Sequence, residues 1–345
     1  MRFVTFSIAT SAGPISRIGV ERQDRILDVT AASAWRLRND GVYAAEALAR
    51  DIVGDDMVAF LSRWPIARME AERDITFADS QSAASVNPFG ARISYRLDEV
   101  RLRLPLRPRR IKDYLVYEEH KKKSMQRRGL EMPELWYRMP TYTNRNVMGL
   151  GEPGDDIAWP NYSQKLDFEF EIAVVIGKMG RNIRAEDADA YIAGYTIYND
   201  FSARDIQADE GKIGAGAGKS KDFDQGNVLG PCIVTPDEID PSNLAMTLRV
   251  NGQEWSRGST RGMKFTWGQI IENASRGETI YPGDVFASGT MDNGCSLELG
   301  RWIEPGAVIE MEAQGIGTLR NRVVRASDNG RSAGRQRDHR FSFGD

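Results

Sequence analysis

The chain of 345 residues contains little cysteine and little histidine, with two of each. Cys232 and Cys295 are far apart in sequence, so they form neither a CxxC motif nor a disulfide framework, which suits a reducing cytosol. His339 falls in a polar tail, and His120 is the one imidazole among other polar candidates. A lone histidine is more often structural than catalytic, but histidine is also the side chain that titrates near neutral pH.

The sequence also lacks long apolar runs and a strong charge of either sign. No apolar run reaches the ~18 residues that indicate a membrane span. The start, MRFVTFSIATSAG, is more typical of a first strand than of a signal peptide. A net charge of −3 argues against nucleic acid as a partner. We therefore expect a cytoplasmic protein that binds neither membrane nor nucleic acid and acts on a small molecule.

The pattern of apolar residues predicts two domains and a tail. Residues 1–100 alternate short strands with helical stretches such as residues 43–53 and 55–64. From residue 101, strands separated by Gly and Pro turns dominate, for example residues 192–200, 244–252 and 308–314. We expect a small N-terminal α+β domain (1–100), a β-rich catalytic domain (101–327) and a polar tail (328–345).

Acidic and apolar residues alternate in DFEFEIAVVIG, residues 167–177, which predicts a strand that becomes fully buried. The alternation places Asp167, Glu169 and Glu171 on one face. A solvated strand face is the more common explanation of such residues, and on this segment alone it stays ahead of a cation site. Of the three carboxylates, Asp167 lies one step out, where we expect it to meet solvent or a basic neighbour.

Two further segments carry acidic residues at informative spacings. In IYNDFSARDIQ (197–207), Asp200 stands where a strand stops and is expected to cap a helix, with Arg204 and Gln207 following on its face. In DYLVYEEH, Asp113 and His120 are seven residues apart, which is two turns on one helical face. The alternatives are a surface salt bridge or a metal site. Carboxylates without clustered His or Cys favour Mg²⁺, Ca²⁺ or Mn²⁺ over zinc.

Taken together, these motifs resemble the fumarylacetoacetate hydrolase (fumarylacetoacetase) family over roughly residues 105–325. The matching segments are DYLVYEEH, DFEFEIAVVIG, GYTIYNDFSARDIQ, KSKDFDQGNVLGP, YPGDVFASGT and CSLEL. The resemblance implies a mixed β-sandwich or roll in the C-terminal domain, usually in a homodimer. It also implies a divalent metal, Mg²⁺ first, held by Asp113, Glu169, Glu171 and Asp200.

The resemblance assigns the other roles as well. It implies His120 paired with Glu298 as the catalytic base, with Arg204, Gln207 and Lys221 lining the site and Thr290 contacting substrate. Leu115 stands where fumarylacetoacetase itself has a tyrosine, so the expected substrate is a related 2,4-dioxo acid rather than fumarylacetoacetate. The implied reaction is metal-dependent hydrolysis of a C–C bond in an acylpyruvate-type substrate, in catabolism of aromatic or related compounds.

Several alternatives stay open. The same scaffold suits a hydratase, decarboxylase, isomerase or lyase acting on a 2-oxo acid, and a non-catalytic cation-binding protein is a remote alternative. The basic run HKKKSMQRRG is either a solvated helix face or an attractor for a substrate carboxylate. The aromatic-rich segment after it suggests a lid, with Tyr142 as a candidate substrate contact. IGAGAGKS (213–220) is not a P-loop, because Ile213 replaces the first glycine.

Overall fold

The computed structural model describes residues 1–81, 86–214 and 216–325. The tail expected at residues 328–345 lies outside these ranges. Among the described residues, no helix combines the length and the apolarity needed to cross a membrane. The cytoplasmic location and the homodimer stay predictions.

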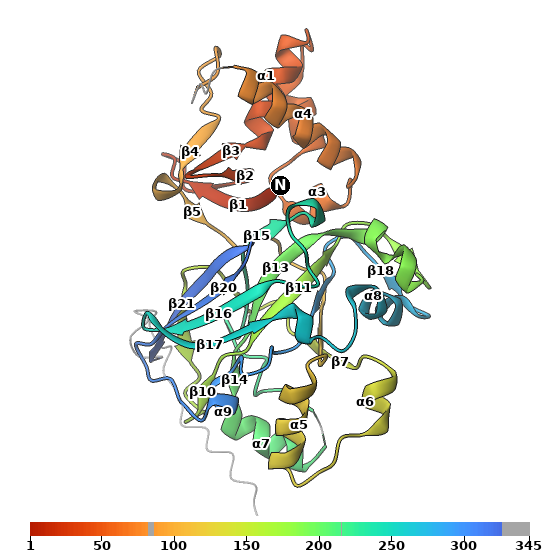
Figure 1. Cartoon of the computed structure of the whole chain (residues 1–345). Coiled ribbons are helices and arrows are strands. Elements are labelled where there is room, and N and C mark those ends of the chain that lie inside the picture. The colour runs from red at the N-terminus through yellow and green to blue at the C-terminus, as the bar shows by residue number, and fades with distance from the viewer. Residues whose placement is uncertain (82–85, 215, 326–345) are drawn as a thin grey trace, which may run out of the picture.

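The N-terminal part packs helices over one end of a sheet, at the top of Figure 1. Its strands are β1 (Arg2–Ile8), β2 (Ile15–Arg22), β3 (Arg25–Asp28), β4 (Ser94–Arg96) and β5 (Arg101–Leu102). Its helices are α1 (Val29–Asn39), α2 (Ala45–Ile52), α3 (Met57–Leu61) and α4 (Ile66–Ser80). Helix α1 begins where it does because Asp28 accepts the backbone N–H of Ala31 at 2.9 Å, as an N-cap.

These strands continue into a 12-stranded sheet ordered β4-β3-β2-β1-β15-β13-β11-β19-β6-β7, with β5 on β1 and β8 on β15. The added strands are β6 (Ile111–Tyr114), β7 (Tyr142–Arg145), β8 (Leu150–Gly151), β11 (Phe170–Ile176), β13 (Ile192–Asp200), β15 (Asn227–Val234) and β19 (Val285–Ala287). Because β1 pairs with β15, the sheet runs unbroken across the expected boundary at residue 100. The division into domains stays a prediction.

A second sheet of five strands packs against the first, in the order β17-β16-β20-β21-β9. Its strands are β9 (Asp156–Trp159), β16 (Ala245–Val250), β17 (Gln253–Ser259), β20 (Val308–Ala313) and β21 (Gly317–Arg325). Strand β11 alternates between two cores: Ile172 and Val174 face the second sheet, and Ala173 and Val175 join the core that contains Phe60 of α3. The predicted β-rich α+β fold with a C-terminal sandwich is confirmed.

The remaining elements gather around the sandwich. The short strands are β10 (Leu166–Asp167), β12 (Gly180–Arg181), β14 (Ser202–Ala203) and β18 (Thr279–Ile280). The helices are α5 (Glu118–Arg127), α6 (Glu134–Arg138), α7 (Arg204–Lys212), α8 (Trp267–Ser275) and α9 (Ser296–Leu299). Figure 1 shows α5, α7 and α9 at the end of the molecule opposite the N-terminal part. The candidate residues converge at that end.

Candidate functional site

Three carboxylates lie on one face of the large sheet, on strands that are far apart in sequence. Asp113 pairs with Ala287 of β19, Ala287 pairs with Ala173 of β11, and Glu171 lies two residues before Ala173 on the same face. Asp200 ends the adjacent strand β13. One oxygen from each of the three carboxylates lies within 4.8 Å of the others. The sheet register therefore assembles a cage of Asp113, Glu171 and Asp200.

The cage is buried and incompletely bonded. One oxygen of each carboxylate, Asp113 Oδ1, Glu171 Oε1 and Asp200 Oδ1, is buried without a hydrogen-bond partner among the described residues. Two full charges within 4.8 Å of each other repel by at least about 3.5 kcal/mol at an effective dielectric near 20. Burial, and then the neighbouring acids, raise the pKa of Glu171 well above its ordinary value. Burial likewise raises the pKa of Asp113 to about 7.

Arg145, which the sequence analysis missed, bridges two members of the cage. It donates from Nη2 to Asp113 at 2.6 Å and from Nε to Asp200 at 3.0 Å. It reaches them because β7 pairs with β6, where Arg145 lies opposite Ile111 and so shares a face with Asp113. In the sequence Arg145 directly follows the aromatic-rich segment expected to form a lid, and no local pattern distinguishes it from a surface residue.

Glu169 lies beside the cage, but both of its oxygens are engaged. Arg204 Nη2 donates to Oε1 at 2.8 Å, and Lys221 Nζ bonds Oε2. Lys221 also donates to Asp200 at 2.5 Å. Burial opposes ionisation of Glu169, but Lys221, Arg204 and His120 outweigh it and lower its pKa. Whether Glu169 binds metal, as its sequence suggests, stays a prediction.

The charged groups in and around the cage include more carboxylates than cations. The five carboxylates are Asp113, Asp167, Glu169, Glu171 and Asp200, and the three cations are Arg145, Arg204 and Lys221. If every group is ionised, two negative charges remain in a buried place. One divalent cation would neutralise them, and its natural ligands are the three unpartnered carboxylate oxygens.

The turn after β19 closes one side of the cage. Gly289 donates its backbone N–H to Glu171 Oε2 at 2.9 Å. This glycine has φ +83°, and a Cβ there would lie 2.3 Å from the carbonyl oxygen of Tyr114, so no other residue fits. Thr290 follows directly and is almost fully buried. Its expected role as a substrate contact stays a prediction.

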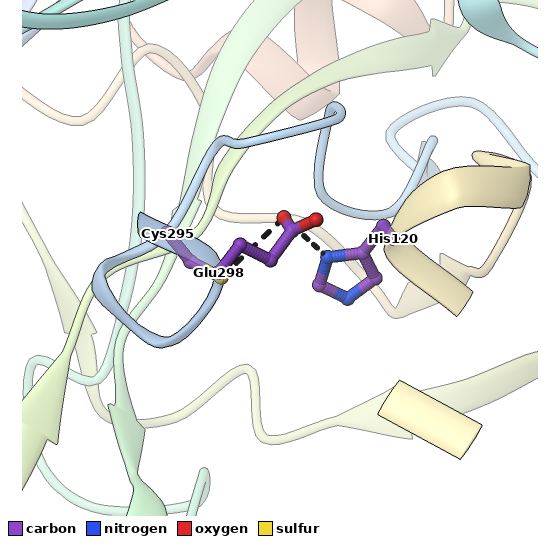
Figure 2. Close-up of side chains that lie close together, drawn as sticks. All are labelled: His120, Cys295 and Glu298. Atoms are coloured by element: carbon purple, nitrogen blue, oxygen red, sulfur yellow. Dashed lines mark hydrogen bonds and ion pairs between the residues drawn. The ribbon is translucent and has the colours of Figure 1, made fainter. Parts of the chain in front are cut away.

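His120 of α5 and Glu298 of α9 lie within hydrogen-bonding distance of each other. His120 Nδ1 lies 2.9 Å from Glu298 Oε2, and Figure 2 shows the Glu298 carboxylate between His120 and Cys295. The Glu298 side chain is 1% exposed. Burial favours its neutral form, but His120 and then Lys123 hold the pKa of Glu298 below its ordinary value. With Nδ1–H directed at Glu298, the neutral imidazole keeps its lone pair on Nε2.

Asp167 links this pair to the cage, although the sequence suggested it was dispensable. It accepts the backbone N–H groups of Ser296 at 2.7 Å and Leu297 at 3.1 Å, the first two residues of α9. It also accepts from Arg204 Nε at 2.8 Å. The expected basic neighbour is therefore correct. The expected solvent contact is wrong, because the side chain is fully buried.

Two predictions of local structure, for Asp113 and for Asp200, were wrong, although both residues lie in the cage. Asp113 lies on strand β6 rather than on a helix with His120, so the two-turn spacing has no structural meaning. Asp200 does not cap α7, because that helix begins at Arg204 and its N-cap residue is Ala203. Arg204 and Gln207 do share a helical face, and Arg204 Nη1 donates to Gln207 Oε1 at 2.9 Å.

Tyr142 is not brought to the cage. It pairs with Tyr114, one residue along from the pair of Asp113 with Thr143, so it points to the opposite face of the sheet. There its hydroxyl accepts from Lys112 at 2.8 Å. Thr143, like Arg145, lies on the face of this strand that Asp113 shares, but Thr143 is exposed.

The basic run of α5 divides into paired and unpaired cations. Lys122 pairs with Glu118 at 2.8 Å, and Arg127 donates to the carbonyl of Leu297 at 2.5 Å. Lys123 donates to Asn293 at 2.6 Å and lies 3.4 Å from Glu298. Within the described part of the chain, Lys121 and Arg128 have no hydrogen-bonding side-chain partner or ion pair. Burial, and then Arg128, lower the pKa of Lys121.

Comparisons with known proteins agree with these features. A family model described as the C-terminal part of fumarylacetoacetate (FAA) hydrolase matches residues 110–324. A mitochondrial oxaloacetate tautomerase of Homo sapiens is 39% identical over 174 residues, which are 50% of this chain and 55% of the tautomerase. The chain thus spans about half the length of that relative.

Solved structures resemble nearly the whole chain. A fumarylacetoacetate hydrolase from Exiguobacterium antarcticum has a TM-score of 0.68 and 26% identity, over 94% of this chain and 99% of that one. A maleylpyruvate hydrolase from Sphingobium sp. SYK-6, solved with manganese(II) and pyruvate, has a TM-score of 0.66 and 24% identity over 94% and 99% of the two chains. At that identity the second likeness shows the fold alone.

Proposed function

We propose that this chain, which belongs to the fumarylacetoacetate hydrolase family, is a metal-dependent hydrolase that cleaves a C–C bond in a 2,4-dioxo acid of the acylpyruvate type. The observation that carries the proposal is the pairing of His120 Nδ1 with Glu298 at 2.9 Å beside a cage of buried carboxylates. A base for water is needed for hydrolysis and is not needed for decarboxylation.

The residues of the cage fit a hard divalent cation. Asp113, Glu171 and Asp200 would hold it through their unpartnered oxygens, and Mg²⁺ is our first expectation, with Mn²⁺ and Ca²⁺ as alternatives. When bound, the ion supplies Lewis-acid stabilisation of negative charge on the substrate's carbonyl oxygens. Arg145 keeps the net charge of the region at the value that one such ion balances.

His120 activates water through Nε2. Glu298 accepts the Nδ1–H, fixes the tautomer and stabilises the imidazolium after the proton has been taken. The hydroxide adds to the acyl carbonyl, and the C–C bond then breaks with its electron pair entering the enolate of the leaving 2-oxo acid. His120 returns the proton to that carbon. Water is consumed, and an acid and a 2-oxo acid are released.

Among the described residues, Lys221 and Gln207 keep N–H donors without a partner, and these donors are available to the developing oxyanion. Lys221 has three N–H groups and uses two of them, on Glu169 and Asp200. Gln207 accepts from Arg204 through Oε1, which fixes the orientation of the amide and leaves both Nε2–H groups to donate. These donors are held in place before substrate arrives, as electrostatic stabilisation requires.

The two unpaired cations suggest a second anionic group on the substrate. Lys121 is adjacent to His120 and half-buried, and Arg128 is its electrostatic neighbour. A half-buried ammonium without an ion pair is costly unless a ligand supplies the counter-charge. We therefore favour acylpyruvates whose acyl group carries a distal carboxylate.

A product-resolved substrate panel tests the function. Acylpyruvates with and without a distal carboxylate, and oxaloacetate, would be incubated with the enzyme and Mg²⁺ or Mn²⁺, and the products identified by NMR. We expect pyruvate and the matching acid from the acylpyruvates. Clean decarboxylation, or no change in any compound, would overturn the proposal.

Tautomerisation of a 2-oxo acid is the second candidate, because of the 39% identity to oxaloacetate tautomerase. The same cage would stabilise an enolate, and His120 would shuttle a proton between carbon and oxygen without water entering the product. Loss of the enol absorbance of oxaloacetate, with no carbon lost and no acylpyruvate cleaved, would favour this reaction.

A further inference from the structure

Cys295 is a buried thiol that the proposed reaction does not use. It is fully buried and stands at the N-cap position of α9, three residues before Glu298. Its Sγ lies 3.6 Å from Glu298 Oε2, the same oxygen that faces His120 Nδ1. Figure 2 shows the imidazole and the thiol on opposite sides of this carboxylate. Neither general-base catalysis nor the carboxylate cage requires sulfur at this place.

The three side chains have the donor types and spacing of a zinc site. One ligand atom from each of His120, Cys295 and Glu298 lies within 4.8 Å of the other two. Tetrahedral Zn²⁺ binds nitrogen and oxygen at about 2.1 Å and sulfur at about 2.3 Å, which places its ligand atoms roughly 3.4–3.6 Å apart. The observed separations of 2.9 Å from nitrogen to oxygen and 3.6 Å from sulfur to oxygen need only small side-chain shifts.

The donor set also separates this cluster from the cage. Thiolate and imidazole ligands suit Zn²⁺, whereas an all-oxygen cage suits Mg²⁺, Ca²⁺ or Mn²⁺. The second oxygen of Glu298, Oε1, is buried without a hydrogen bond to any residue that the structure describes, and it lies 3.4 Å from Lys123. Two sites of different chemistry therefore lie side by side, and they share no ligand.

We propose that His120, Cys295 and Glu298 form a second, inhibitory metal site that takes Zn²⁺ and rejects Mg²⁺, and that its occupation switches off the hydrolysis. The inhibition rests on the function proposed above, whereas the binding does not.

The chemistry of occupation explains the inhibition. The Cys295 thiol gives its proton to solvent and binds as thiolate. The ring proton of His120 moves from Nδ1 to Nε2 as Nδ1 becomes a ligand, so the lone pair that would take a proton from water is lost. Glu298 binds through its carboxylate and no longer orients the imidazole. Two anionic ligands and one neutral ligand balance the charge of the ion, which favours binding in a buried place.

The test combines binding and turnover in the full-length protein loaded with Mg²⁺. Co²⁺ replaces Zn²⁺ as the binding probe, because a thiolate ligand gives cobalt a charge-transfer absorption that oxygen ligands do not. Cys295→Ala removes the thiol, with Cys295→Ser as a second variant should the alanine protein fail to fold. Cys232→Ala is the matched control, since Cys232 is also buried but its Sγ bonds the carbonyl of Ile316 at 3.2 Å.

We expect the absorption in wild type and in Cys232→Ala, and not in Cys295→Ala. One equivalent of Zn²⁺ per chain, added to enzyme already loaded with Mg²⁺, should lower the turnover of wild type at least tenfold. The same addition should lower the turnover of Cys295→Ala less than twofold. Absence of the cobalt–thiolate absorption in wild type would overturn the site, as would equal zinc inhibition of wild type and Cys295→Ala. If no substrate turns over, the proposed function fails, and the absorption alone decides the site.

Discussion

The carboxylate of Asp167 accepts the backbone N–H of Ser296, 2.7 Å away, and so joins strand β10 to the first turn of α9. Because the same carboxylate accepts from Arg204 and α9 carries Glu298, one buried side chain positions both halves of the site.

Replacing Asp167 with asparagine should lower kcat by about 10–100-fold while leaving the affinity for Mg²⁺ within a fewfold of wild type. Both oxygens of Asp167 are engaged as acceptors, and an amide nitrogen can satisfy neither Arg204 nor a backbone N–H. Steady-state kinetics beside metal titration measure the two effects. Asp205→Asn is the control, because Asp205 accepts from the Ser163 hydroxyl at 2.6 Å and from the backbone N–H of Gln164 at 2.7 Å. Turnover of Asp167→Asn within twofold of wild type would contradict the role.

We expect Glu171, in the cage, and Glu169, beside it, to affect metal binding unequally. Glu171→Gln should weaken Mg²⁺ binding by 100-fold or more, since Glu171 Oε1 is unpartnered and available to an ion. Glu169→Gln should weaken it less than Glu171→Gln, because both oxygens of Glu169 are already bonded to Arg204 and Lys221. Isothermal titration with Mg²⁺ or Mn²⁺ measures both. Equal losses of Mg²⁺ affinity in the two variants would indicate that Glu169 is a direct metal ligand, as Glu171 is expected to be.

Lys121→Ala should raise KM about tenfold for an acylpyruvate with a distal carboxylate and leave KM unchanged for one with a neutral acyl group. A charge-assisted contact of this kind is worth about 1.5–3 kcal/mol. Lys122→Ala is the control, because that ammonium is exposed and paired with Glu118. The same change in KM for both substrates would show that Lys121 does not bind the distal carboxylate of the substrate.

We expect the stability of the protein to depend on pH through Asp28, which lies in the N-terminal part, away from the site. Burial raises the pKa of this N-cap carboxyl to about 6, against about 3.9 in an unfolded chain. The folded protein therefore holds a proton that the unfolded chain has lost between about pH 4 and 6. This contribution to stability is present at low pH and is lost as pH rises through 6.

Asp28→Asn keeps a capping oxygen for Ala31 without the buried charge. Because wild type loses this contribution as pH rises, the stability of Asp28→Asn relative to wild type should increase from pH 4.5 to pH 7.5, by at most about 3 kcal/mol in the free energy of unfolding. Urea unfolding at the two pH values gives the difference. Asp28→Ala, which loses the cap, should be destabilised at both pH values. An equal difference between wild type and Asp28→Asn at pH 4.5 and 7.5 would contradict the shift.

The residues of the site were easier to predict than the geometry that unites them. The alternation in DFEFEI and the polar residues of IYNDFSARDIQ selected Glu171, Asp200 and Arg204 as candidates, and the resemblance to the fumarylacetoacetate hydrolase family implied their roles. The expected helical relation of Asp113 to His120 was wrong, because Asp113 joins the cage through the parallel pairing of β6 with β19. No local periodicity reports such a long-range pairing.

Residues whose partners are distant in sequence were missed for the same reason. Arg145 meets Asp200 across 55 positions, and Asp167 meets Ser296 across 129. A buried polar residue with distant partners looks, in one sequence, like any solvated one. Cys295 likewise becomes a candidate metal ligand only because Glu298 and His120, which lies on another helix, are close to it in the structure.

The central claim is that His120 and Glu298 direct water at a carbon–carbon bond. The most direct measurement is turnover of an acylpyruvate in ¹⁸O-labelled water with Mg²⁺, followed by mass spectrometry of the released acid. We expect one solvent oxygen in the carboxylate of that acid, and a 10²–10⁴-fold loss of rate in His120→Ala. Cleavage without labelled oxygen in the acid, tautomerisation without cleavage, or a His120→Ala rate within tenfold of wild type would contradict it.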